Sequence, residues 1–467
     1  SVARQSHAVE SVGWRLPRHF VPRNDEQPWR MSFVVVGLLA MLCGCATYQP
    51  QPLEDRSPLV AAVLPSGFGH SYDIDLSDGL DLTETGIIAV LNNPDLKVQR
   101  ARLQVAGAQA FSAGLLPDPQ LGAGFDKPTG NAAPDTAWLV GLSYDIIPLI
   151  TRQARIDAAH KGQEKIRLDL LWQEWQVIQQ ARSLAVRVQL EEQRLALLHT
   201  MRALYQERYQ RSAAALKTGD ITLGVNGVDL TALVDTLSQI NQLEQTHNQT
   251  RHSFNLLLGL DPQAAVAISS LSPATHLDPA TMNARLDQLP RVRPDLLALK
   301  AGYESQEARV RAAILAQFPS LGIGVNRASD TDNVDTIGLS VSLTLPLFSG
   351  NRGNIAIERA TREQLQEEYR ARLAQTRVDV DRLLVLQTLL QQQQDDLQTY
   401  LPHLKTLVDR ARGAYSRGDI EALTFLTMES TWVNKRLEQI SLTQTAWENR
   451  IALEALLALP GYRDTPL

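Results

Sequence analysis

In two stretches of the sequence, residues 335–345 and 137–146, apolar side chains alternate with residues that are mostly polar or small. In the first stretch, Thr, Ser and Gly fill the positions between five apolar side chains: Ile337, Leu339, Val341, Leu343 and Leu345. The second stretch carries apolar or aromatic side chains at every second position: Trp138, Val140, Leu142, Tyr144 and Ile146. A period of two residues predicts a β-strand whose two faces lie in different media.

Each of these strands has a shorter partner upstream, residues 120–125 and 320–325, so the sequence predicts two hairpins, residues 119–146 and 319–345. Strands of about ten residues are long enough to cross a membrane when they are tilted. A soluble sheet with one buried face is the alternative, but no remaining segment offers an apolar partner layer. Four strands cannot close a barrel, and an open edge in lipid leaves backbone groups unsatisfied. We therefore expect several chains to share one barrel.

After Pro148 and again after Pro346 the pattern changes to helix for about 65 residues, or roughly 100 Å. In the second helix apolar residues recur in the steps of three and four that are typical of a coiled coil. Gln393 and Tyr400 fill two positions of this series, and its apolar members are Leu383, Leu386, Leu390, Leu397, Leu404, Leu407, Ala411 and Ala414. The first helix follows the same spacing, interrupted by Glu174, Glu191 and Arg202. Pro402 is expected to kink the second helix locally. Each long helix ends at a Gly-Asp turn, after which a return helix is predicted.

This order of elements occurs twice, about 200 residues apart, which indicates internal repeats. Three motifs mark the duplication: Pro94-Asp95-Leu96 returns as Pro294-Asp295-Leu296, Leu121-Gly122-Ala123-Gly124 as Leu321-Gly322-Ile323-Gly324, and Gly219-Asp220-Ile221 as Gly418-Asp419-Ile420. The predicted fold class is mixed, a long α-helical coiled-coil barrel joined to a transmembrane antiparallel β-barrel. We place the two repeats at residues 82–262 and 292–459, with a linker at 263–291 and a C-terminal tail at 460–467.

The N-terminal part of the sequence resembles a bacterial lipoprotein signal. Residues 32–43 form an apolar run of signal-peptide length, too short to span a membrane as a helix. The following Leu42-Cys43-Gly44-Cys45 resembles a lipobox, in which cleavage would expose Cys45 for lipidation. A chance cysteine pair or a local disulfide is the alternative. We expect a signal peptide at 1–45, with its start site open, a covalent lipid on Cys45, and an extended tether at 46–81.

The duplicated motifs together resemble the TolC family of outer-membrane factors, in its lipoprotein branch. The resemblance covers residues 82–459 and rests on Asn93-Pro94-Asp95-Leu96, the strand-to-helix steps at Pro148-Leu149 and Pro346-Leu347, and the turns at Gly219 and Gly418. It implies a homotrimer in which four strands per chain build a twelve-stranded barrel, continued into the periplasm by a helical tunnel.

The function implied by this resemblance is that of the outer-membrane channel of a tripartite efflux or secretion system, a passive exit duct for small molecules or ions. The implied partners are a periplasmic adaptor protein, an inner-membrane transporter and outer-membrane lipid. The implied location is the outer membrane, with a lipid anchor and an extension into the periplasm.

In such proteins the helical turns form the periplasmic end, so the resemblance implies that the adaptor docks at Gly219, Ile221, Gly418 and Ile420. Threefold symmetry would turn an inward carboxylate into a ring that favours cations. The candidates for this aperture are Asp220, Asp229, Asp235, Asp419 and Glu421. Equally, Asp220 and Asp419 could serve only as local turn or helix-start residues. Thr424 and Thr427 stand where relatives can carry gate-forming Asp, and the first turn holds extra residues near Gly224–Gly227, which leaves the identity of the gate open.

Composition argues against other classes of function. The net charge is −6, and Lys and Arg are spread through the helices, so the sequence lacks the basic patch of a nucleic-acid-binding protein. The nine His residues are dispersed, and we expect neither a metal site nor a cofactor other than the lipid. No catalytic motif stands out, so we do not expect an enzyme. The alternative function is a periplasmic coiled-coil scaffolding lipoprotein without a membrane-spanning barrel.

Overall fold

The computed structural model describes residues 48–53, 55, 59, 79–129, 135–272, 274 and 276–459. The chain divides into two units, residues 1–57 and 58–467. In the first unit the described residues are exposed and carry no helix or strand. The predicted signal peptide, Cys45 and the tail at 460–467 lie outside the described residues. Of the predicted tether, Leu80 is held in place, because its backbone bonds to Ala267 and Ser269 in the linker.

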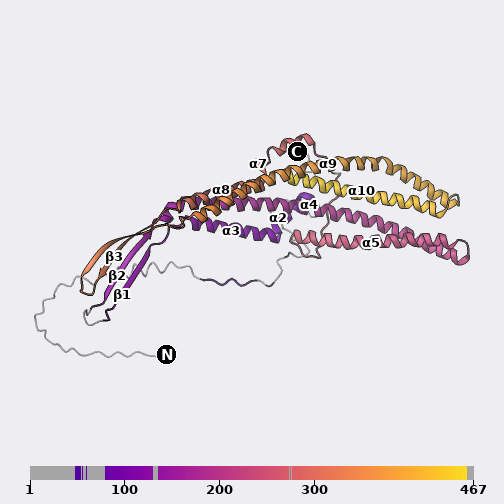
Figure 1. Cartoon of the computed structure of the whole chain (residues 1–467). Coiled ribbons are helices and arrows are strands. Elements are labelled where there is room, and N and C mark those ends of the chain that lie inside the picture. Colours follow the sequence, from indigo (N-terminus) through magenta and orange to yellow (C-terminus); the bar gives the residue numbers. More distant parts are fainter. Residues whose placement is uncertain are drawn as a thin grey trace, which may run out of the picture. The chain divides into compact units, whose positions relative to one another are not determined.

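Four antiparallel strands form one sheet in the order β1-β2-β3-β4 (Figure 1). They are β1 (Gln120–Asp126), β2 (Ala137–Asp145), β3 (Ser320–Ser329) and β4 (Asp335–Thr344). The first two and the last two form the hairpins that the alternating patterns predict, and β2 pairs with β3 to join the two repeats. Each repeat therefore supplies half of the sheet.

The register places the apolar residues of all four strands on the same face. Opposite pairs include Leu121 with Leu142, Val325 with Leu339, and Ile323 with Val341. In the single chain this face is uncovered, since the side chains of Ile337 and Leu339 are 84% and 75% exposed. The other face carries mainly Gly, Ser, Thr and Asn. We call these the apolar and the polar face of the sheet.

Three helices of the first repeat correspond to three helices of the second. The first repeat has α2 (Leu82–Asn92), α3 (Pro94–Gly114), α4 (Ile147–Thr218) and α5 (Leu223–Leu257). The second has α8 (Pro294–Leu315), α9 (Arg352–Arg417) and α10 (Ala422–Leu457), which correspond to α3, α4 and α5, while α6 (Pro279–Leu286) and α7 (Leu289–Val292) lie in or beside the predicted linker. The long helices α4 and α9 have 72 and 66 residues, as the sequence predicts, and α9 continues through Pro402.

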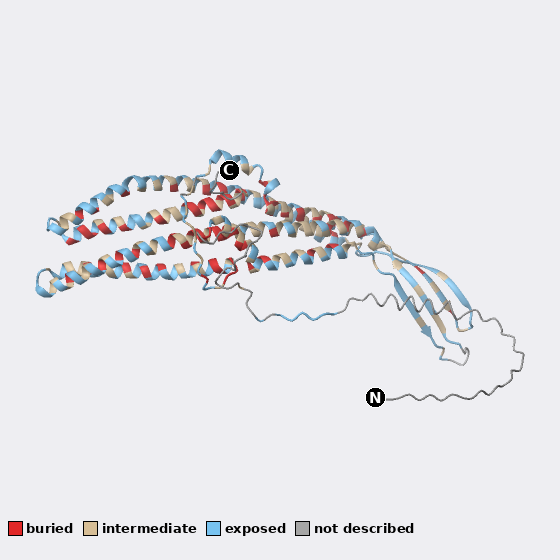
Figure 2. Cartoon of the chain, turned by 180° about the vertical axis from the view of Figure 1, so that it is seen from behind, coloured by how far each residue is buried: buried red, intermediate tan, exposed pale blue. Residues whose placement is uncertain are grey.

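The helices lie side by side in a wall rather than around one central core (Figures 1 and 2). Next to the sheet, α3 packs on α4, α4 on α8 and α8 on α9. Toward the far end, α5 packs on α4, α4 on α10 and α10 on α9. Buried apolar residues form separate clusters along this wall, for example Met201, Tyr205, Leu426 and Val433. None of the described helices combines the length and the apolar character needed to cross a membrane.

The two repeats anchor α3 and α8 at equivalent positions but with different side chains. Asn93 caps α3 by accepting from the Leu96 amide at 3.0 Å, and its own amide donates to the Leu257 carbonyl at 3.0 Å. Arg293 precedes α8 and donates to the Leu456 carbonyl at 3.2 Å and to Asp295 at 2.7 Å. In both repeats, a residue before Pro-Asp-Leu thus ties the start of one helix to the last turn of the return helix.

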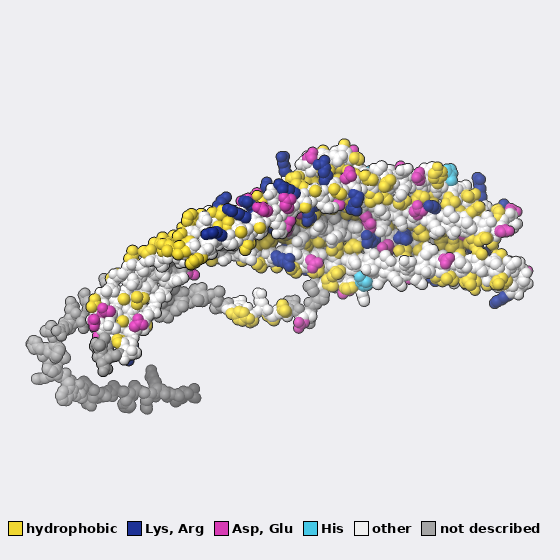
Figure 3. Space-filling model, viewed as in Figure 1, with side chains coloured by type: hydrophobic (Ala, Val, Ile, Leu, Met, Phe, Trp, Pro, Cys, Tyr) yellow, Lys and Arg dark blue, Asp and Glu magenta, His cyan; other side chains and the backbone are white. Residues whose placement is uncertain are grey.

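Hydrophobic side chains also gather on the surface where the helices meet the sheet (Figure 3). Leu345, Leu347 and Phe348, which follow β4, are highly exposed in the single chain, Phe348 to 95%. Contiguous exposed apolar surface of this kind marks contact with lipid or another protein.

Candidate functional site

The two turns at the far end of the helical wall have the same construction. Gly219 and Gly418 have φ of 82° and 80°, and each is the left-handed residue that ends a long helix. In the first turn the Gly219 amide donates to the Leu216 carbonyl and the Asp220 amide to the Ala215 carbonyl. The Gly418 turn repeats this pair of bonds, which together define a Schellman motif. Glycine is favoured at both positions by the positive φ alone, because a Cβ there would meet no atom within 4 Å.

The two turn aspartates are exposed and bind within their own turns. The Asp220 carboxylate accepts from the Thr218 hydroxyl at 2.5 Å, and the Asp419 carboxylate accepts from Arg417 Nε at 2.8 Å. These contacts agree with a local supporting role, yet both carboxylates remain accessible to solvent. Ile221 and Ile420 are half-buried, and Ile420 packs against the cluster of Val408, Ala411 and Phe425.

The remaining aperture candidates lie in different environments. Glu421 is exposed at the start of α10. Asp235 is exposed and lines a hollow of about 590 Å³ between α4, α5 and α10. Asp229, in contrast, is only 4% exposed, and its carboxylate binds Arg208 at 3.1 Å. In the single chain the Asp229 carboxylate is thus already paired and, unlike the carboxylates of the other four candidates, lies buried between packed helices.

Asp229 belongs to a network that takes one charged residue from each of the four long helices. Arg208 of α4 binds Asp229 of α5 and, at 3.0 Å, Glu429 of α10. Glu429 also binds Arg412 of α9 at 3.2 Å. Because Glu429 is 1% exposed, both of its oxygens depend on these guanidinium groups for compensation. The network joins the α4–α5 hairpin to the α9–α10 hairpin.

Two aromatic rings pack beside the Arg208 guanidinium of this network. Arg208 lies over the Phe425 ring at 5.1 Å, and Phe425 stacks on Tyr415 with 5.4 Å between the ring centroids. Burial, together with the charge of Glu429, raises the pKa of Tyr205 to about 12. The Tyr205 hydroxyl therefore stays neutral at physiological pH, beside charges that balance one another.

The sequence pattern does not mark this network. The coiled-coil series of α4 reaches Tyr205 by a step of three from Arg202, so its next core position is Tyr209 and Arg208 lies one residue before it. A buried carboxylate requires a partner, but the spacing does not reveal which one. Glu429 lies 221 residues away in the sequence, and only the fold brings the two together.

A second buried carboxyl group lies between α4 and α5, far along these helices from the Gly219 turn. Glu191 is 3% exposed, accepts from the Thr250 hydroxyl at 3.2 Å and faces His247 at 3.4 Å. Burial raises the pKa of its carboxyl above the ordinary value, although the hydroxyl and the imidazole oppose that rise. Glu191 is one of the residues that interrupt the apolar series of α4, so the sequence does mark it. Among the described residues, no cluster of His, Cys, Asp and Glu is suited to hold a metal ion.

Comparisons with known proteins agree with this architecture. Residues 286–459 match the model of a family described as outer membrane efflux protein. No curated protein matches the sequence. The chain is similar to the crystal structure of CusC, with 18% identity, a TM-score of 0.68, and coverage of 89% of this chain and 99% of that one.

Two further channel structures are similar over almost their whole length. CmeC of Campylobacter jejuni has 17% identity and a TM-score of 0.68, with coverage of 88% of this chain and 94% of that one. MtrE of Neisseria gonorrhoeae has 17% identity and a TM-score of 0.67, with coverage of 88% and 98%. These likenesses confirm the predicted fold class, strands joined to a long helical body.

Proposed function

We propose that the chain is the outer-membrane channel of a tripartite efflux or secretion system, a proposal supported by the match of residues 286–459 to the outer membrane efflux protein family. It would provide a passive duct across the outer membrane and into the periplasm for small molecules or ions. The observation that carries this proposal is the four-stranded sheet with one uncovered apolar face and two open edges.

The edges of the sheet require partners. β1 and β4 are its outer strands, and within the described chain each pairs with a strand on one side only. In lipid, unpaired backbone N–H and C=O groups cost several kcal/mol each. Pairing β4 of one chain with β1 of the next would satisfy both edges at once. Three copies would then form the closed twelve-stranded barrel that the family resemblance implies.

The wall of helices next to the sheet has the same kind of open edges. α3 and α9 are its outer members, and each carries exposed apolar side chains at multiples of seven residues. On α3 these are Val98 and Val105, and on α9 they are Ile357, Val378 and Val385. Seven-residue spacing is the signature of a helix that packs against another helix. Contact between α3 of one copy and α9 of the next would extend the barrel into a tube.

The orientation of the tube in the cell envelope follows from the chemistry of its two ends. The apolar face of the sheet suits lipid, whereas its polar face suits a water-filled lumen. The far end, with the turns at Gly219 and Gly418, would lie in the periplasm and receive the adaptor protein, which joins the duct to an inner-membrane transporter. Ile221 and Ile420 would contribute to that docking end, and Asp220, Asp235, Asp419 and Glu421 remain candidates for its aperture.

We also propose that Cys45 carries a lipid that anchors the chain in the outer membrane. Support comes from Leu42-Cys43-Gly44-Cys45 and the apolar run before it.

The test of this proposal is conductance by the purified protein. Trimers extracted from the outer membrane should open channels in planar lipid bilayers and should migrate as heat-modifiable trimers in gels. If the protein is instead released from membranes by carbonate after Cys45→Ala and gives no conductance, the scaffolding role is correct and the duct is not.

A further inference from the structure

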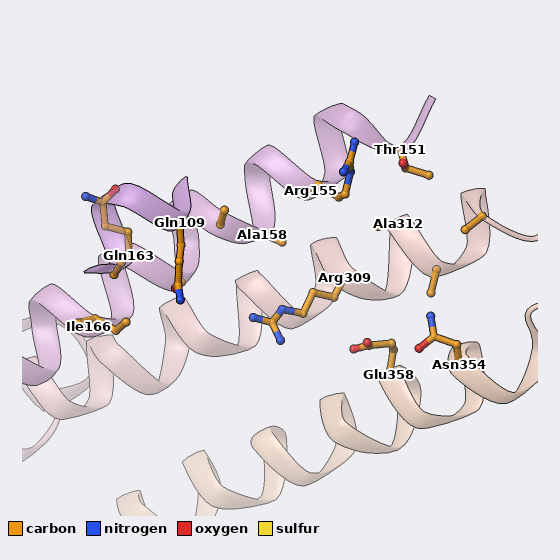
Figure 4. Close-up of a pocket in the computed structure, with 15 residues that line it drawn as sticks. Gln109, Thr151, Arg155, Ala158, Gln163, Ile166, Arg309, Ala312, Asn354 and Glu358 are labelled. Carbon is orange, nitrogen blue, oxygen red and sulfur yellow. The ribbon is translucent and has the colours of Figure 1, made fainter. Parts of the chain in front are cut away.

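A hollow of about 560 Å³ lies in the helical wall close to the sheet (Figure 4). Residues of α3, α4, α8 and α9 line it together. Small side chains make the space, among them Ala158 and Gly162 on α4 and Ala312 and Ala313 on α8. Because neither a large side chain nor a neighbouring helix fills it, this part of the wall can admit a ligand.

The hollow opens on one side of a row of helices. α3 packs on α4, α4 on α8 and α8 on α9, and residues of all four helices line the hollow together. If three such walls close into a tube, the row becomes part of a ring, and a hollow shared by four neighbouring helices of a ring lies on its inner side. This inference therefore rests on the proposed function, in which the inner side is the lumen.

The charged residues of the hollow are unbalanced. Two guanidinium groups, Arg155 and Arg309, face it with a single carboxylate, Glu358, so the lining carries a net positive charge. Glu358 is engaged with the side chain of Gln306. Arg155 donates to the Pro148 carbonyl at 2.8 Å, and among the residues that the structure describes neither guanidinium forms an ion pair. Arg309 is exposed on α8, with Glu358 and Asn354 on the neighbouring α9 (Figure 4).

The uncharged polar groups of the hollow fit the same kind of ligand. The side-chain amides of Gln109, Gln163 and Asn354 line it and can donate hydrogen bonds. Ile166 and the alanines supply apolar surface beside them. Guanidinium groups bind carboxylate, sulfonate and phosphate oxygens in pairs and are weakly hydrated, so they retain this capacity on a wet wall.

We propose that this hollow is a transit site for amphipathic organic anions on the lumen wall of the upper tunnel. Arg309 and Arg155 attract the anionic group, and the alanine-lined floor accepts the apolar part. Threefold symmetry repeats the site around the lumen, so cargo of this class meets three equivalent positions just below the barrel.

The experiment measures the local potential with a cysteine reporter at Ala312. In trimers carrying Ala312→Cys, reaction rates are compared for the anionic reagent 2-sulfonatoethyl methanethiosulfonate and the cationic 2-trimethylammonioethyl methanethiosulfonate. Adding Arg309→Gln should lower the ratio of anionic to cationic rates by about five- to tenfold, because a surface potential of about one kT acts with opposite sign on the two reagents. The protein without the added cysteine gives the background rate.

Arg311→Gln is the matched control. It removes the same charge from the same helix, but two residues correspond to about 200° of rotation, which places Arg311 on the opposite face of α8. We expect this control to change the ratio less than twofold. In addition, hexanesulfonate should slow labelling of Ala312→Cys by uncharged methyl methanethiosulfonate, whereas hexyltrimethylammonium should not.

Two results overturn the inference. One is an equal effect of Arg309→Gln and Arg311→Gln, and the other is equal protection by the two hexyl compounds. Bilayer conductance of the same Ala312→Cys trimers separates this failure from that of the proposed function. Conducting trimers with an unresponsive reporter would refute only the anion site, and trimers without conductance would refute both.

Discussion

Arg208 and Glu429 form an ion pair of 3.0 Å between α4 and α10, and Glu429 is almost completely buried. The pair joins two helical hairpins that come from different repeats of the sequence. Asp229 shares the same guanidinium at 3.1 Å. Arg208 therefore compensates two buried carboxylates, and the packing of this end of the wall depends on it.

Replacing Arg208 should destabilise the protein strongly. Arg208→Met leaves Asp229 with no cation and Glu429 with only Arg412, and removing one partner of a buried pair costs about 3–5 kcal/mol. Thermal unfolding of the purified trimer, followed by circular dichroism, should show a clear drop in midpoint. Arg211→Met is the matched control, since Arg211 is exposed and, among the residues that the structure describes, its ion pair is with Glu207 one turn away. Equal midpoints for the two variants would contradict the role given to Arg208.

The turn at Gly418 should tolerate asparagine better than tryptophan. Its φ of 80° favours Gly and admits Asn, and the open space around it accepts a larger side chain without a clash. Gly418→Trp should leave trimer assembly intact but block export, because a bulky ring would occupy the proposed docking end. The measurement is the drug or metal tolerance of a host that lacks its own duct. Gly418→Asn should retain most of that tolerance, and full tolerance with Gly418→Trp would argue against this docking end.

The two faces of β4 should respond in opposite ways to charge. Leu339→Arg puts a cation on the apolar face, which costs about 2–4 kcal/mol at the middle of a membrane. Ser340→Arg places the same charge on the polar face one residue later. We expect Leu339→Arg to reduce the amount of assembled trimer in outer-membrane fractions severalfold and Ser340→Arg to assemble normally. The reverse order would mean that the polar face meets lipid.

Stability should depend on pH through Glu191. Burial raises the pKa of this carboxyl in the folded chain, so the folded state binds a proton more tightly than the unfolded state does. The resulting stabilisation is complete below the ordinary pKa of glutamate and is lost as the pH rises through the raised value. Glu191→Gln should therefore flatten the fall of the unfolding midpoint between mildly acidic and neutral pH. Glu192→Gln, which changes the more exposed neighbour, should leave that fall unchanged.

Some elements could be predicted from the sequence because a local pattern determines them. The alternation from Ile337 to Leu345 defines β4 and its apolar face, and the Gly-Asp pairs at Gly219 and Gly418 define the ends of the long helices. The environment of Asp229 could not be predicted in this way. Whether a carboxylate on α5 points into a tunnel or toward Arg208 depends on how α5 is rotated against α4, and that rotation is set by tertiary packing.

The same reasoning explains why the anion site and the Arg208 network had no prediction of their own. Arg155 and Arg309 lie on helices from different repeats, and the sequence around each does not distinguish it from the many solvated arginines of the chain. Only the packing of α4 on α8 places both at one hollow. The duplication shows which elements correspond, but it does not show that α4 and α8 lie side by side. Local periodicity thus specifies the elements and their faces, and contacts between the repeats specify the sites.

The most direct test of the shared barrel is disulfide cross-linking between its two proposed edge strands. One cysteine replaces Leu121 on β1, and a second replaces in turn Ile337, Leu339, Val341 or Leu343 on β4, all on the apolar face. If β4 of one copy pairs with β1 of the next, at least one combination should yield covalently linked trimers on a denaturing gel, and Leu121→Cys alone should not. Monomers in all four combinations, in protein that is folded and membrane-bound, would contradict the channel.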